Sequence, residues 1–131
     1  AGMLSKALEI NPYYGEAYSN MGLVLAMQGR VEESVGYFQK AVKYSPRSEE
    51  AHYNCGRAMA KLGRTDEAIK YFEGALKINP SLADAHCGLG LSFMAKGDVE
   101  KAAEHFRQAL QISPENQLAS DSLQRIMGGG N

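Results

Sequence analysis

The stretch 51–80, AHYNCGRAMAKLGRTDEAIKYFEGALKINP, decides the fold of this chain. Its first half spaces apolar residues three or four positions apart, which places them along one side of a helix: Ala51, Cys55, Met59 and Leu62. Gly63 is of the residue type that most often follows the end of a helix, and either Thr65 or Asp66 is expected to cap the next one. Pro80 ends that second helix, because proline has no amide hydrogen to donate. The stretch therefore predicts two helices joined by a short turn.

The second predicted helix has an apolar face of its own, formed by Ala68, Ile69, Phe72, Ala75, Leu76 and Ile78. Small residues stand where two antiparallel helices would touch, with Gly56 on the first helix and Ala68 and Ala75 on the second. Phe72 is predicted to fill the space between them. The stretch is therefore expected to form one hairpin of closely packed helices.

The same pattern returns every 34 residues. All four prolines keep that spacing: Pro12, Pro46, Pro80 and Pro114. Glycine keeps it at 22, 56 and 90 and again at 29, 63 and 97, and phenylalanine keeps it at 38, 72 and 106. A period of this length indicates a stacked array of helix pairs, in which each repeat buries its apolar face against its neighbours.

The repeat resembles the tetratricopeptide repeat (TPR), whose signature has a bulky aromatic, Leu-Gly, a second aromatic, Ala-x3-Phe and Pro within 34 residues. The matching residues are Tyr18, Gly22, Ser34, Phe38, Ala41 and Pro46 in repeat 15–48, His52, Gly56, Ala68, Phe72, Ala75 and Pro80 in repeat 49–82, and His86, Leu89, Gly90, Ala102, Phe106, Ala109 and Pro114 in repeat 83–116. The resemblance covers almost the whole chain. It implies an all-α fold, a right-handed α-solenoid of stacked antiparallel helix pairs.

The repeats leave a short segment at each end. Residues 1–14 match only the second helix of a repeat, so we expect a partial repeat there. We infer that the chain is the C-terminal part of a longer protein. Residues 117–127 are expected to form a capping helix with Leu118, Leu123 and Ile126 on its apolar side. One array is thus predicted over 1–127, followed by a disordered tail at 128–131.

Composition narrows the function. The net charge is −1 with acids and bases interleaved, which argues against nucleic-acid binding. The sequence contains no run of 18 apolar residues, which a membrane-spanning helix would need, and we recognise no secretory signal at its start. Cys55 and Cys87 are too few for a disulfide framework, so reduced thiols and a cytoplasmic location are expected.

A resemblance to TPR proteins implies that the first helix of each repeat lines a concave groove. The residues expected to face it are Glu16, Ser19, Asn20, Leu23 and Met27, then Glu50, Tyr53, Asn54, Arg57 and Lys61, then Asp84, Cys87, Gly88, Leu91 and Met94. This mixture of apolar and hydrogen-bonding side chains suits a peptide. The six residues predicted to carry the binding site are Asn20, Leu23, Tyr53, Asn54, Arg57 and Leu91.

Asn20 and Asn54 occupy equivalent positions, and a side-chain amide can pair with any peptide backbone. The pair resembles the asparagine ladder of O-linked N-acetylglucosamine transferases, although Gly88 stands at the third rung. A polar residue on an exposed helix face is the alternative interpretation.

Two further features of the predicted groove involve charge. The acidic row Glu16, Glu50 and Asp84 would favour basic peptides, but each carboxylate is also explained by a place in the first turn of a helix. Some TPR proteins hold the acidic C-terminus of a chaperone with a clamp of two lysines, an arginine and two asparagines. The matching positions in this chain are Ser19, Leu23, Asn54, Asp84 and Gly88. Only Asn54 fits, so that activity is not expected.

No catalytic residue, metal site or cofactor is predicted. His52 and His86 occupy the bulky packing position of the repeat and are expected to be structural, about 10 Å apart and so too distant to share one zinc ion. His105 is expected to be exposed. Cys55 is expected in the core, and Cys87 is expected to face the groove, where it could react.

The predicted function is a protein–protein interaction scaffold that holds a peptide or partner protein in its groove. The alternative is a non-catalytic TPR appendage of a larger enzyme or membrane protein, for example a glycosyltransferase, that positions substrate or drives self-association. Self-association would use the apolar edge of the partial repeat, at Met3, Leu4 and Leu8.

Overall fold

The computed structural model describes residues 12–128, and within that range it contains seven helices and no strand. The helices are α2 (Pro12–Met27), α3 (Val31–Tyr44), α4 (Glu49–Lys61), α5 (Thr65–Ile78), α6 (Ala83–Ala95), α7 (Val99–Ile112) and α8 (Gln117–Gly128). The predicted all-α fold is confirmed. None of these helices is both long and apolar enough to cross a lipid bilayer.

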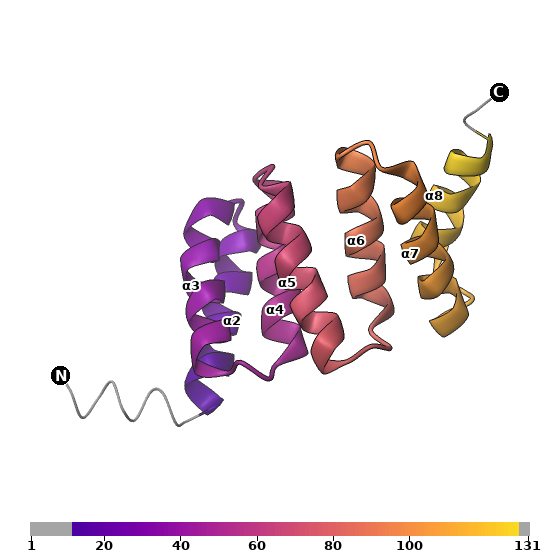
Figure 1. Cartoon of the computed structure of the whole chain (residues 1–131). Coiled ribbons are helices and arrows are strands. Elements are labelled where there is room, and N and C mark those ends of the chain that lie inside the picture. The colour runs from indigo at the N-terminus through magenta and orange to yellow at the C-terminus, as the bar shows by residue number, and fades with distance from the viewer. Residues whose placement is uncertain (1–11, 129–131) are drawn as a thin grey trace.

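The helices form pairs that stack in chain order (Figure 1). α2 packs against α3, α4 against α5 and α6 against α7, and each second helix then contacts the first helix of the next pair. The first helices also contact one another directly, α2 with α4 and α4 with α6, whereas the second helices meet at most marginally. The stack therefore bends towards α2, α4 and α6, and we call the surface that these three helices form the inner surface.

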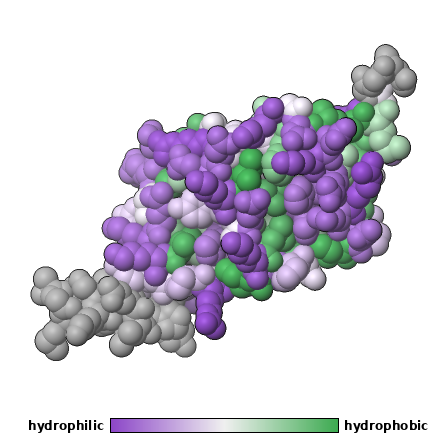
Figure 2. Space-filling model, viewed as in Figure 1, coloured by the Kyte–Doolittle hydropathy of each residue, from purple (hydrophilic) through white to green (hydrophobic). Residues whose placement is uncertain are grey.

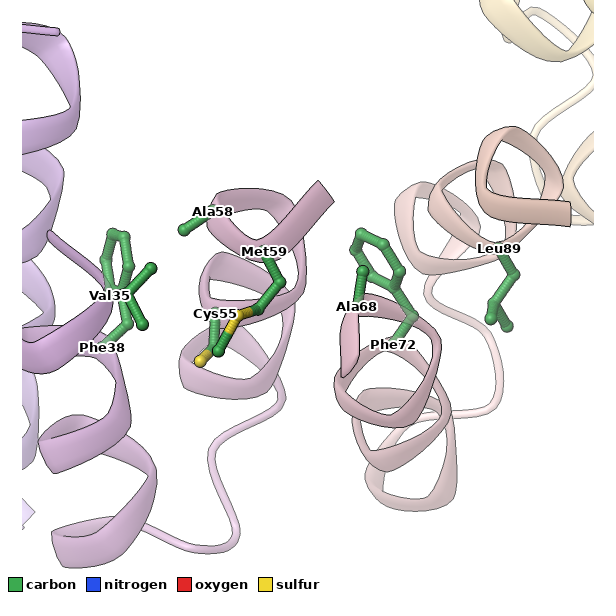
Figure 3. Close-up of a cluster of buried hydrophobic side chains, with 8 residues drawn as sticks. All are labelled: Val35, Phe38, Cys55, Ala58, Met59, Ala68, Phe72 and Leu89. Carbon is green, nitrogen blue, oxygen red and sulfur yellow. The ribbon is translucent and has the colours of Figure 1, made fainter. Parts of the chain in front are cut away.

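One phenylalanine from each second helix fills the centre of its pair. Phe38, Phe72 and Phe106 are each at most 2% exposed. A Cβ atom on the facing glycine would lie 2.6 Å from Phe38 at Gly22 and 2.9 Å from Phe72 at Gly56. Figure 3 shows that Phe72 shares a continuous cluster with Cys55 and Met59 of α4 and with Leu89 of α6. The predicted helix hairpin with phenylalanine at its centre is confirmed.

The turns inside the pairs are short. Gly29, Gly63 and Gly97 adopt positive φ angles of 80°, 77° and 82°, which agrees with their predicted place at helix ends. The prediction that Thr65 or Asp66 caps α5 is wrong. The Arg64 amide donates a hydrogen bond to the Met59 carbonyl, which closes the turn after α4. Arg64 is therefore the N-cap residue of α5, and its side chain makes no capping hydrogen bond.

The two ends of the array depart from the sequence-based expectation in detail. α2 begins at Pro12, so Glu16 lies beyond its first turn, and the predicted helix-end role of that carboxylate is wrong. In α8, Leu123 and Ile126 pack on the Phe106 cluster as predicted, but Leu118 is 48% exposed and does not belong to that face. The partial repeat with Met3, Leu4 and Leu8 lies outside the described residues except for 12–14, and so does the tail beyond Gly128.

Candidate functional site

Three hollows follow one another along the inner surface. The loop hollow lies between the start of α2 and the 44–51 segment, and it is lined by Asn20, Glu16, Arg47 and Glu50 among others. The α2–α4 hollow lies between those two helices, and the α4–α6 hollow extends from α4 past α6 to the start of α8. All six residues predicted to carry the site line one of the three hollows.

The α2–α4 hollow is small and largely apolar. Leu23 and Met27 of α2 and Val31 of α3 form one wall, and Ala58 of α4 forms part of the other. Its volume is about 140 Å³. An enclosed cavity of ~150 Å³ in another protein holds one benzene molecule, so this open hollow has room for about one apolar side chain.

Asn54 lies between the walls of the α2–α4 hollow. Its side chain is only 6% exposed, and its amide nitrogen has no hydrogen-bond partner within residues 12–128. A buried donor left unpaired costs about 1–3 kcal/mol. The equivalent Asn20 is exposed, because no described helix packs beside it on the corresponding side of α2. The two asparagines thus differ in environment, although the sequence pattern makes them equivalent.

Arg57 and Lys61 stand between the α2–α4 hollow and the α4–α6 hollow and line both of them. They are one turn apart on α4, and both are exposed. The Arg57 guanidinium lies 5.7 Å from the centre of the Tyr53 ring. No carboxylate within residues 12–128 forms an ion pair with either side chain; the four ion pairs found there involve Arg30, Arg64, Lys96 and Lys101. We call Arg57 and Lys61 the basic ridge.

The α4–α6 hollow combines predicted and unpredicted residues. Leu91 of α6 is 47% exposed there, as predicted, and the exposed Leu118 of α8 joins it. Tyr53 is half-buried and its ring lies 5.8 Å from that of Phe72, so this residue belongs to the groove and to the core at once. Burial, and next the charge of Asp84, raise the pKa of the Tyr53 hydroxyl, which therefore stays protonated at neutral pH.

The face drawn in Figure 2 is mostly hydrophilic, with apolar residues gathered near its middle. Exposed apolar side chains line the hollows on all three helices of the inner surface: Met27 on α2, Ala60 on α4 and Leu91 on α6. Apolar patches of this kind on a folded chain mark interaction surfaces.

The structure explains the missing third rung of the predicted asparagine ladder. A Cβ atom on Gly88 would lie 2.6 Å from the Phe72 ring, so this position has no room for a side chain unless the ring moves. At the preceding interface, the equivalent Asn54 fits beside Phe38. The ladder is therefore limited to Asn20 and Asn54.

Comparison with known families decides the identity of the fold. A family model described as "Tetratricopeptide repeat" matches residues 19–83 and 53–117, which together cover most of the chain. The chain belongs to the tetratricopeptide repeat family. A comparison with curated protein sequences found no match.

Solved TPR structures resemble the array closely. The first TPR domain of Spaghetti (RPAP3), bound to the HSP90 peptide SRMEEVD, is 20% identical with a TM-score of 0.89, and the match covers 93% of this chain and 97% of that one. MamA is 26% identical with a TM-score of 0.85, over 96% of this chain and 74% of that one. YrrB, "a TPR protein with an unusual peptide-binding site", is 30% identical with a TM-score of 0.80, over 82% of this chain and 56% of that one.

The histidines at the bulky TPR position are structural, as predicted. Each ring forms a hydrogen bond with a backbone carbonyl six residues earlier. Nε2 of His52 lies 3.1 Å from the Pro46 carbonyl oxygen, and Nε2 of His86 lies 3.2 Å from that of Pro80. The expectation that His105 is exposed is wrong, because its ring stacks on Phe93 and its Nδ1 lies 3.2 Å from Nδ1 of His86. Because His86 donates a hydrogen bond from Nε2 to the Pro80 carbonyl, its Nδ1 accepts the hydrogen bond that Nδ1 of His105 donates.

Cys87 lines the α4–α6 hollow, as predicted, but the expectation that it could react is wrong. Cys87 is 3% exposed and Cys55 is fully buried. Burial raises the pKa of the Cys55 thiol to about 11, and burial together with the charge of Asp84 raises that of Cys87. Neither TPR cysteine is therefore a nucleophile at neutral pH. Within residues 12–128, no three His, Cys, Asp or Glu side chains are arranged to hold a metal ion.

Proposed function

We propose that this chain is a non-catalytic protein-interaction module that holds a segment of a partner protein along its inner surface. The observation that carries the proposal is the Asn54 amide, which is buried and has no partner within residues 12–128, in a hollow whose other lining residues are apolar except for Arg57 and Lys61. The amide nitrogen has less than 1 Å² of accessible surface, so a peptide carbonyl would supply the missing acceptor once the Asn54 side chain rotates into the hollow that it lines. The gain is large for one hydrogen bond, because the cost of burying the amide is already present in the free protein.

The surrounding chemistry supports a peptide in preference to a small metabolite. The three hollows are open, the loop hollow and the α2–α4 hollow both lie between α2 and α4, and together they offer apolar contacts on α2 and α6 with polar groups on α4 between them. Solved TPR domains of RPAP3 carry HSP90 and HSP70 peptides, which is consistent with this use of the fold. The unpaired thiols fit a reducing compartment such as the cytoplasm.

The experiment is a selection of twelve-residue peptides from a random library, followed by measurement of affinity by fluorescence anisotropy. Asn54→Ala should weaken the selected peptides by about tenfold, the value of one good hydrogen bond to a buried group. Gln111→Ala, an exposed change on α7 away from the inner surface, is the matched control and should leave binding unchanged. Failure to select any peptide whose binding depends on Asn54 would refute the proposal.

A further inference from the structure

The basic ridge forms no ion pair within residues 12–128, although Asp84 lines the α4–α6 hollow with it, and the ridge stands between two largely apolar hollows. Arg57 and Lys61 both line the α2–α4 hollow and the α4–α6 hollow, and neither is paired with a carboxylate within residues 12–128. Arg64, which is only one turn further along the chain, is by contrast paired with Glu32 at 3.7 Å. Arg47 and Lys70 also form no ion pair within these residues, but they do not line both hollows as Arg57 and Lys61 do.

The distance between the two hollows sets the spacing of the ligand. They lie on either side of α4, and packed helices are about 8–10 Å apart. A polyproline II segment rises 3.1 Å per residue with three residues per turn, so its side chains at i and i+3 share one face and are about 9 Å apart. A β-strand would place side chains at i and i+3 on opposite faces, and side chains at i and i+2 only about 7 Å apart. An α-helix would also place side chains at i and i+7 on one face, about 10.5 Å apart, but its carbonyls are bonded within the helix. A polyproline II segment matches the spacing and leaves its carbonyls free to accept from Asn54.

We infer that the groove recognises a polyproline II segment with large apolar residues at i and i+3 and an acidic residue between them. The first apolar side chain enters the α2–α4 hollow beside Leu23, and the second lies against Leu91 and Leu118 in the α4–α6 hollow. The carboxylate meets Arg57 and Lys61, and the backbone carbonyl near it accepts from Asn54. The inference rests on the proposed function and adds the chemistry of the partner.

The acidic row is the competing feature. Glu50 and Asp84 line the outer two hollows at the starts of α4 and α6, and they would favour a basic segment. Both lie in the first turn of their helices, where the free amide groups of the helix already stabilise a carboxylate. Lys61 lies in the last turn of α4, where the helix dipole stabilises its charge in the same way, whereas Arg57 lies before that turn and has no such compensation. The preference is therefore for an acid opposite α4.

The test reads the sequences that the peptide selection enriches. Against the wild type, they should share two apolar residues three apart with Asp or Glu between them. Replacing that acid by Lys should weaken binding about tenfold, since two exposed ion pairs of up to about fivefold each are lost. The double variant Arg57→Glu/Lys61→Glu should enrich Lys or Arg at the same place, while the matched change Lys70→Glu/Lys77→Glu on α5 should leave the acidic preference intact.

The outcomes separate this inference from the proposed function. Peptides that depend on Asn54 but carry a basic or neutral residue between the apolar ones, or apolar residues at another spacing, would overturn the inference and leave the proposed function standing. Enriched sequences that are unchanged by Arg57→Glu/Lys61→Glu would also overturn it. A selection that yields no peptide dependent on Asn54 would overturn both.

Discussion

The Phe72 ring lies 2.6 Å from the point at which Gly88 would carry a Cβ atom. The same ring lies 2.9 Å from the corresponding point on Gly56, so it is held between two glycines of α4 and α6. This contact ties the second helix pair to the third. It also leaves the floor of the α4–α6 hollow without a side chain at position 88.

Gly88→Ala should destabilise the array by about 1 kcal/mol. Alanine gains about 1 kcal/mol of helix propensity, but overpacking a filled core costs about 1–3 kcal/mol. Gly36→Ala is the matched control, because Gly36 is exposed within α3 and nothing lies near its added Cβ. It should stabilise by about 0.5–1 kcal/mol. Urea denaturation measures both, and equal stabilisation of the two variants would show that Phe72 moves freely.

Phe72→Ala should cost about 3–5 kcal/mol of unfolding free energy, the usual loss for a buried aromatic side chain. Tyr53→Ala should cost about 1 kcal/mol, because Tyr53 is only half-buried and loses a fraction of the burial energy of a full side chain. Chemical denaturation of both variants compares them directly. Equal midpoints would show that the assignment of core and groove is wrong.

His105 makes stability depend on pH. Burial, and next the neighbouring His86, lower the pKa of His105 below its ordinary value of 6.5, and the charges of Glu104 and Glu73 offset part of that effect. The unfolded chain therefore binds more protons than the folded one as pH falls through and below about 6.5, and the unfolding free energy falls with pH in that window.

The variant His105→Tyr tests this dependence. Tyrosine stands at the equivalent place in the preceding pair, where Tyr71 lies 6.3 Å from His52. Melting curves between pH 7.5 and 5.5 should show a smaller loss of stability in the variant than in the wild type. An identical loss in both proteins would exclude His105 as its source.

The cysteines should resist modification in the folded protein. Cys55 and Cys87 are buried and their pKa values are raised, so little thiolate is present or accessible at pH 8. Dithiodipyridine should react slowly with the native chain and quickly with both thiols in urea. Rapid reaction of one native thiol that disappears in Cys87→Ser would restore the reactive role that the sequence had suggested for Cys87.

The period of 34 residues was sufficient to predict the fold, since the glycines, prolines and phenylalanines mark helix ends and helix contacts within a single pair. The contacts between successive helix pairs were predicted less well. The burial of Cys87 and the exposure of Leu118 were missed because both depend on how α8 packs on the last helix pair, which the repeat pattern does not specify. His105 was misplaced for a similar reason: helical periodicity gave the side of α7 on which it lies, but not its contact with His86.

The asparagine pair illustrates the same limit at the groove. Equivalent positions in the sequence predicted equivalent environments for Asn20 and Asn54, yet only Asn54 lies between two described helices and is buried. All six predicted residues line the hollows, and the structure adds that Arg57 and Lys61 line two of them and form no ion pair within residues 12–128.

The most direct measurement is a map of amide chemical shifts in the isotopically labelled protein as a selected peptide is added. The account predicts that the largest changes cluster on α2, α4 and α6, centred on Asn54, Arg57 and Leu91, with smaller changes on α3, α5 and α7. Changes confined to α3, α5 and α7 would place the partner on the opposite surface and would contradict the assignment of the groove.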